Sequence, residues 1–153
     1  AVFVLSAARI KPAQIEAAKA VQAALEEASA RRDVGAIVDL NSDFHMAVAI
    51  GAGNANLAEI YQHQMIEGTR LSALTLRCYL VSDWGGEMAK LITDHHDILD
   101  AAAAHDQHAM ATLSDRHVEL SRNQVVKALT QEDPAGLLGD VSDVAAAHLT
   151  ADG

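Results

Sequence analysis

Residues 34–50 have the sequence VGAIVDLNSDFHMAVAI. Its large apolar side chains recur every three or four residues, which is the spacing of one helix face. They are Ile37, Leu40, Phe44 and Val48. Asp33 supplies an oxygen for an N-cap before the stretch, and Gly51 and Gly53 end it. The pattern predicts a helix that buries one face against other helices.

The same spacing recurs along the chain and predicts an all-α protein. Nothing alternates with the period of two that marks a half-buried strand, so we expect no sheet. Gly68 interrupts the apolar pattern of the longest helix and predicts a bend, while SDWGG at 82–86 and DPAG at 133–136 predict turns. We expect a bundle of about six helices, over residues 12–31, 34–50, 55–81, 87–103, 107–131 and 135–148.

Composition places the chain among globular proteins. Its 153 residues are half apolar and only 3% aromatic, which suits one alanine-rich helical domain. A net charge of −10 argues against the chain holding nucleic acid by itself, because phosphate binding needs clustered Lys and Arg. No apolar run reaches the roughly 18 residues of a membrane span. The single Cys78 can form no internal disulfide, which fits a reducing cytoplasm.

The first residues, AVFVLSAARI at 1–10, look like the end of something longer. They begin without a methionine, a helix cap or a turn, and they lack the basic segment and long apolar core of a signal peptide. We therefore expect residues 1–153 to form a single domain that is a fragment of a larger protein.

Four side chains on three predicted helices have the chemistry of metal ligands. Asn41 and His45 stand four residues apart and so project from the same side of one helix. His95 and His117 each fall on the apolar side of their own helix. Taken singly, each histidine is more often a core residue with one hydrogen-bond partner. Together they could converge inside the bundle, where neutral imidazoles suit zinc, nickel, copper or iron and leave a position open.

The remaining charged and polar residues have plainer interpretations. Arg70 and Arg77 lie two turns apart on one side of the longest helix. They are either solvated surface charges, with Glu67 as the partner of Arg70, or ligands for an anion. Four further histidines are predicted to be solvated: His63, His105, His108 and His148.

Two stretches carry a family resemblance. LNSDFHMAVAIGAGNANL at 40–57 resembles the start of the FCD domain, where Asp or Asn stands four residues before a His and a Gly-Asn turn follows. DHHDILDAAAAHDQHAMATLSDRHVEL at 94–120 resembles the second half of that domain, with a His before an Ile-Leu pair and another His after an Asp cap. The resemblance covers roughly residues 5–130. The FCD domain is the effector-binding half of FadR-type GntR transcription regulators.

The resemblance implies an antiparallel all-helical bundle and a small carboxylate effector near a metal, for which we expect zinc or nickel. It implies the ligand set Asn41, His45, His95 and His117. Arg70 or Arg77 would then bind a second acidic group of the effector. Asn41 stands where the family has Asp at a metal site, so one negative charge is missing. Such regulators are expected to be cytoplasmic homodimers that reach DNA only through an N-terminal winged-helix domain, which this chain does not contain.

Three functions compete. A sensor domain, without enzyme activity, is the leading interpretation. The alternative is a metal-dependent phosphohydrolase of the HD type, for which His96-Asp97 and His105-Asp106 supply the His-Asp pair. Against it, Asp106 suits a helix N-cap better, and His96 points about 100° away from the apolar face. The third interpretation is a helical interaction module whose histidines are structural.

Overall fold

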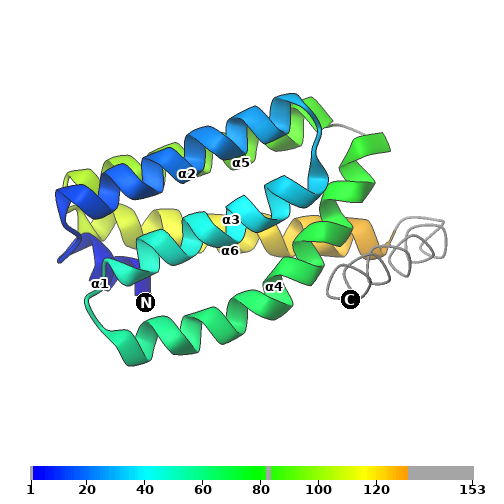
Figure 1. Cartoon of the computed structure of the whole chain (residues 1–153). Helices are drawn as coiled ribbons and strands as arrows, with labels where there is room; N and C mark the ends of the chain where they lie inside the picture. The colour runs from blue at the N-terminus through cyan, green and yellow to red at the C-terminus, as the bar shows by residue number, and fades with distance from the viewer. Residues whose placement is uncertain (1, 82–83, 131–153) are drawn as a thin grey trace, which may run out of the picture.

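The computed structural model describes residues 2–81 and 84–130, and they form an all-α bundle without a strand. Consecutive long helices run in opposite directions, so the bundle is antiparallel (Figure 1). α2 packs against α3 and α5, and α6 packs against α1, α4 and α5. No described helix has the length and apolar character needed to cross a membrane. The helices are α1 Val2–Ala7, α2 Pro12–Ala30, α3 Val34–Ile50, α4 Ala55–Val81, α5 Trp84–Ala103 and α6 Gln107–Leu129.

Five of the predicted helices are confirmed, with ends that agree closely except at the start of α5. The turn predicted at 82–86 is wrong from Trp84 onward, because α5 already begins there and the Trp84 indole is buried. Its ring N–H donates to the backbone carbonyl of Ser29 at 3.3 Å. Residues 82–83, the DPAG turn and the helix predicted over 135–148 lie outside the described residues.

The helix ends follow the predicted capping chemistry. Asp33 accepts a hydrogen bond from the backbone N–H of Ala36, and Asp106 accepts one from that of Ala109. These bonds satisfy donors that the first turn of a helix leaves unpaired. Between α3 and α4 the chain turns at Gly53, whose φ of +64° is a left-handed conformation that glycine adopts without strain.

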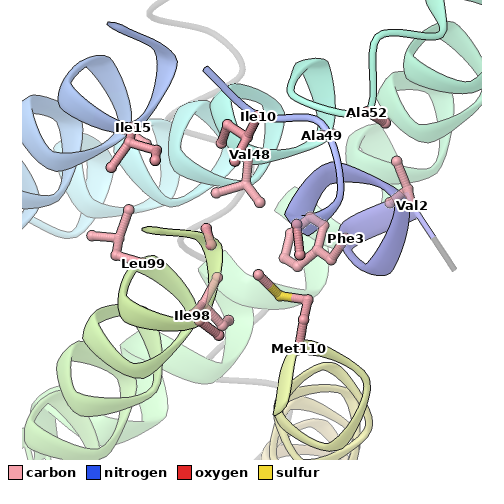
Figure 2. Packing of buried hydrophobic residues seen from close by; sticks show 14 of the residues in the cluster. Val2, Phe3, Ile10, Ile15, Val48, Ala49, Ala52, Ile98, Leu99 and Met110 are labelled. Atoms are coloured by element: carbon pink, nitrogen blue, oxygen red, sulfur yellow. The ribbon is translucent and has the colours of Figure 1, made fainter. Parts of the chain in front are cut away.

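The sequence predicts no helix in residues 1–10, which look like the end of something longer, but α1 forms there. Phe3 is 6% exposed and joins the core at one end of the bundle, beside residues of α3, α5 and α6 (Figure 2). The hydroxyl of Ser6 donates to the backbone carbonyl of Val48 at 2.5 Å. Residues 2–7 are therefore part of the folded domain.

α4 is continuous through Gly68, although Figure 1 shows the helix changing direction along its length. Next to this glycine, the Thr69 hydroxyl donates to the backbone carbonyl of Met65 at 2.7 Å. Such a bond from a threonine back to the preceding turn often bends a helix. As predicted, the helix runs through Gly68 without ending there, and the change of direction lies within it.

Two glycines differ sharply in the space around them, and this gives a matched test of the packing. A Cβ added at Gly51 would lie 2.8 Å from Cγ1 and 2.9 Å from Cβ of Ile10, whereas one added at Gly68 would meet nothing within 4 Å. We expect Gly51→Ala to lower the free energy of unfolding by about 1–3 kcal/mol. Gly68→Ala should raise it by roughly 0.5–1 kcal/mol, because alanine favours a helix interior. Urea unfolding measures the free energy of unfolding of both variants. Equal free energies in the two variants would contradict the close packing of Ile10 against Gly51.

Candidate metal centre

Three histidines from three helices meet inside the bundle. His45 on α3, His95 on α5 and His117 on α6 are 5%, 0% and 8% exposed. Each offers one ring nitrogen, and these three nitrogens lie within 4.8 Å of one another. The sequence pattern places these three histidines on the apolar faces of their helices, and the structure buries all three. The residues described by the structure contain only this cluster of metal-binding type.

Aromatic packing holds two of the rings in place. The ring of Phe44 stacks on His95, with centroids 3.9 Å apart and planes 9° from parallel. Phe3 of α1 stacks on His45 at 5.7 Å between centroids. Because Phe44 is the residue before His45, a single turn of α3 supplies both a histidine of the cluster and the ring that positions another one.

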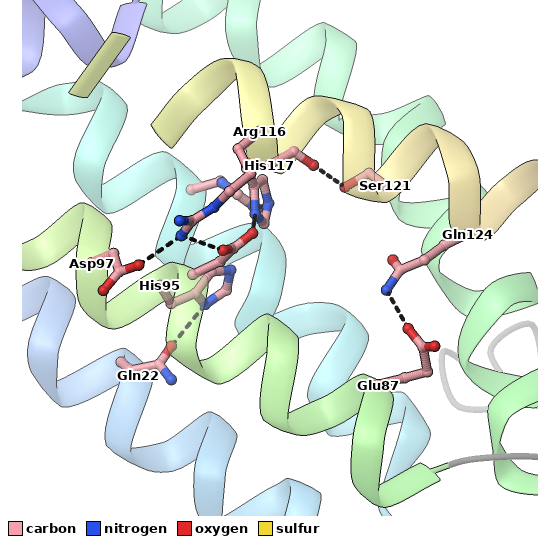
Figure 3. Close-up of polar contacts among 10 residues, drawn as sticks. Gln22, Glu87, His95, Asp97, Arg116, His117, Ser121 and Gln124 are labelled. Atoms are coloured by element: carbon pink, nitrogen blue, oxygen red, sulfur yellow. Dashed lines mark hydrogen bonds and ion pairs between the residues drawn. The ribbon is translucent and has the colours of Figure 1, made fainter. Parts of the chain in front are cut away.

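The orientation of His95 follows from a buried amide. Nδ1 of His95 lies 2.7 Å from Oε1 of Gln22, which is 1% exposed on α2 (Figure 3). An amide oxygen only accepts, so Nδ1 of His95 carries the proton and donates it. The other ring nitrogen, Nε2, then has a free lone pair. Nε2 is fully buried and has no hydrogen-bond partner among the described residues.

A carboxylate orients His117 in the same sense. Nδ1 of His117 lies 3.3 Å from Oδ2 of Asp94 and donates a hydrogen bond to this buried carboxylate. Arg116 fixes that carboxylate by donating to Asp94 at 2.5 Å and to Asp97 at 2.6 Å (Figure 3). Nε2 of His117 is left with its lone pair directed at Nε2 of His45, 3.3 Å away. A histidine that donates one N–H to a carboxylate while the other nitrogen stays bare is the usual state of a metal ligand.

The environment keeps the three imidazoles neutral. Burial, and to a smaller extent the repulsion that a protonated His45 would meet from a protonated His117, lowers the pKa of His45 from 6.5 to about 3. Burial also holds the pKa of His95 well below its usual value, and the three neighbouring histidines add to that shift. Burial lowers the pKa of His117 as well, against an opposing contribution from Asp94. Neutral imidazole is the form that binds a metal.

The donor set fits a divalent transition metal. Two nitrogens that each lie about 2.0–2.1 Å from one ion are separated by about 3.3 Å at a tetrahedral angle. The observed distance between Nε2 of His45 and Nε2 of His117 is 3.3 Å. Without an ion, a proton on Nε2 of His45 can be donated to Nε2 of His117, which leaves Nδ1 of His45 as a buried acceptor without a partner among the described residues. The bare Nε2 of His95 adds a third donor for a metal.

Asn41 lies one turn before His45 on α3. Its side-chain oxygen is buried and accepts no hydrogen bond from any described residue. A buried acceptor without a partner costs about 1–3 kcal/mol, so the position favours a ligand for that oxygen. Asn41, His45 and His117 all border one cavity of about 470 Å³ between α3, α4, α5 and α6.

Neither arginine predicted to bind the effector borders this cavity. Arg70 is exposed, and its guanidinium lies 3.8 Å from Glu67, the plainer of its two predicted roles. Arg77 also lies outside the cavity wall. The arginine on the wall is Arg122, which is exposed and 3.4 Å from Glu119. Sequence spacing could not identify Arg122 as a wall residue, because spacing does not show which side of a helix faces a cavity.

The His-Asp pairs of the phosphohydrolase alternative do not join the cluster. His96 is exposed, with Nε2 2.7 Å from a carboxylate oxygen of Glu26. His105 donates through Nδ1 to the backbone carbonyl of Ala7, and Asp106 is the N-cap of α6 as expected. Of the four histidines predicted to be solvated, His63, His105 and His108 are exposed, and His148 lies outside the described residues.

Comparison with protein families identifies the family of the chain. The family model of the FCD domain matches residues 1–120. The chain belongs to the FCD family. The FCD domain is a regulatory, effector-binding domain of GntR-type transcription regulators. Comparison with curated proteins and with solved structures gives no significant match. The match includes α1, in agreement with its packing against the body of this FCD domain.

Acid should destabilise the metal-free FCD domain through these histidines. Below about pH 6.5 the unfolded chain binds a proton at His45 that the folded chain refuses until about pH 3. The free energy of unfolding should therefore fall as the pH falls across that window, by up to about 1.4 kcal/mol per pH unit for each such histidine. Urea unfolding in the presence of a chelator measures the slope. His45→Leu should reduce it and His63→Leu should not, and equal slopes in both variants would contradict the assignment.

Proposed function

We propose that this FCD domain binds one divalent transition metal, zinc or nickel, at the histidine cluster. The observation that carries the proposal is the group of three buried, neutral imidazoles whose donor nitrogens lie within 4.8 Å of one another. Asn41 is the proposed fourth donor. With no charged ligand among the four, the ion would keep its full positive charge and draw an anion to its open positions.

The surrounding residues would prepare the ligands. Gln22 and Asp94 hold the protons of His95 and His117 on Nδ1, so that Nε2 of each faces the site. Arg116 orients Asp94 by bonding to it directly. Partners of this kind typically affect metal affinity 10–100-fold when they are removed.

The proposed role of the domain is to sense a carboxylate. The cavity that Asn41, His45 and His117 border gives an acid a route to the metal, and its walls come from four helices. A ligand bound there would contact all four and favour one packing of them. In a full-length regulator, which we propose to be a cytoplasmic homodimer, that packing would set the positions of the winged-helix domains that bind DNA.

Metal content should depend on the three histidines together. We expect His45→Ala, His95→Ala and His117→Ala each to lower the metal bound per chain sharply, because each removes one of three imidazole donors. His63→Ala is the control, since His63 is exposed on α4 and lies outside the cluster. Elemental analysis after dialysis measures the content, and circular dichroism checks the fold. The same metal content in all four variants would refute the site.

A carboxylate should stabilise the domain only when the metal is bound. An acid at about 100 times its Kd adds roughly 2.7 kcal/mol to the free energy of unfolding by mass action. A thermal-shift screen of monocarboxylic and dicarboxylic acids, with and without a chelator, tests this. We expect at least one acid to raise the Tm of the metal-loaded protein. A rise that survives complete removal of the metal would contradict the proposed anchor.

A further inference from the structure

The cavity beside the histidines is walled mainly by flexible and branched apolar side chains. They come from all four of the helices that enclose it. They include Ile37 on α3, Met65 and Leu76 on α4, Met88 and Leu91 on α5, and Val125 on α6. Methionines adapt their shape to an apolar guest more easily than branched side chains do.

Two groups of polar residues on the cavity wall are separated along α6 and α5. His117 and Gln124 both border it and stand seven residues apart on α6, or about 10 Å along the helix axis. At the end away from the histidines, Glu87 is already paired. It accepts from Gln124 at 3.2 Å (Figure 3). It also accepts from Lys90 at 3.1 Å, and Nζ of Lys127 lies 3.8 Å from its carboxylate. That end therefore has its hydrogen bonds and charges satisfied without a ligand.

The cavity is larger than a short acid needs. Its volume of about 470 Å³ is roughly three times that of the 150 Å³ cavity which holds a benzene molecule. An acid as short as acetate would fill only the histidine end and leave the apolar wall against water. Each methylene group that covers this wall contributes about 0.8 kcal/mol to binding.

No buried cation borders the cavity, because Arg77, whose Nη1 is buried without a partner among the described residues, is not one of its lining residues. The arginine on the wall, Arg122, is exposed and lies beside Glu119. A second carboxylate placed against the methionines and leucines would lose its hydration without a partner, which is costly. The wall thus selects against dicarboxylic acids that extend into it.

We propose that the ligand of this cavity is a monocarboxylic acid with an extended apolar tail, of the length of octanoate or decanoate. The carboxylate lies at the histidine end and the tail runs between α4, α5 and α6 toward Glu87. This inference rests on the proposed metal and carboxylate function and adds the chemical class of the ligand.

The direct test is calorimetric titration of the metal-loaded full chain with acetate, octanoate, decanoate and succinate. Octanoate should bind at least about 100-fold more tightly than acetate, because it buries six more methylene groups. Succinate should bind no better than acetate. If acetate or succinate binds as tightly as octanoate, the apolar-tail proposal is overturned while the carboxylate function stands. If none of the acids binds, the carboxylate function fails and the tail proposal fails with it.

A matched pair of variants locates the tail. Gly68 borders the cavity and Gly85 does not, and a Cβ added at either would meet nothing within 4 Å. Gly68→Leu should fill part of the cavity and weaken octanoate binding at least tenfold, with metal content unchanged, while Gly85→Leu should leave binding as it is. Should Gly68→Leu fail to fold, Met65→Gln, with Ile66→Gln as its exposed neighbour outside the wall, makes the same comparison. Unchanged octanoate affinity in the folded cavity variant would overturn the proposal.

Discussion

Three uncharged imidazoles are buried at one point in the bundle, and their need for polar partners constrains the helices that enclose them. A ring nitrogen removed from water needs a hydrogen-bond partner or a cation. Here Nε2 of His95 has no partner among the described residues, and two further Nε2 atoms face each other at 3.3 Å. Gln22 and Asp94 accept hydrogen bonds from Nδ1 of His95 and His117, whereas Nδ1 of His45 has no partner among the described residues. The rings of Phe44 and Phe3 pack against His95 and His45. The surroundings thus direct the lone pairs of His95 and His117 toward one point.

That arrangement links helices that are far apart in the chain. The three histidines come from α3, α5 and α6, and Gln22 adds α2 to the same cluster. An ion bound by the histidines would hold three helices together, and the adjoining cavity adds α4. A ligand in this position contacts most of the bundle, which is how occupancy of one small site can alter the packing of a whole effector domain.

The helices were predictable because they are long enough to show a repeating apolar face, whereas α1, with six residues, is too short to show one. The three histidines could be found because each lies on such a face. Their supporting residues could not, since Gln22 is 73 residues from His95 and no local pattern joins them. The sequence also could not show that the side chain of Arg70 lies outside the cavity wall. Helical spacing tells which residues share a face, but the packing of the other helices decides which face borders a cavity.

X-ray absorption spectroscopy at the metal edge of the loaded protein tests the histidine site most directly. We expect three imidazole nitrogens at about 2.0–2.1 Å from a zinc ion, with oxygen in the remaining positions. The imidazole contribution should fall by one ring in each of the three histidine variants that still retains some metal. A spectrum dominated by sulfur or by water oxygen, with fewer than two imidazoles, would show that the metal binds elsewhere and that the cluster is structural.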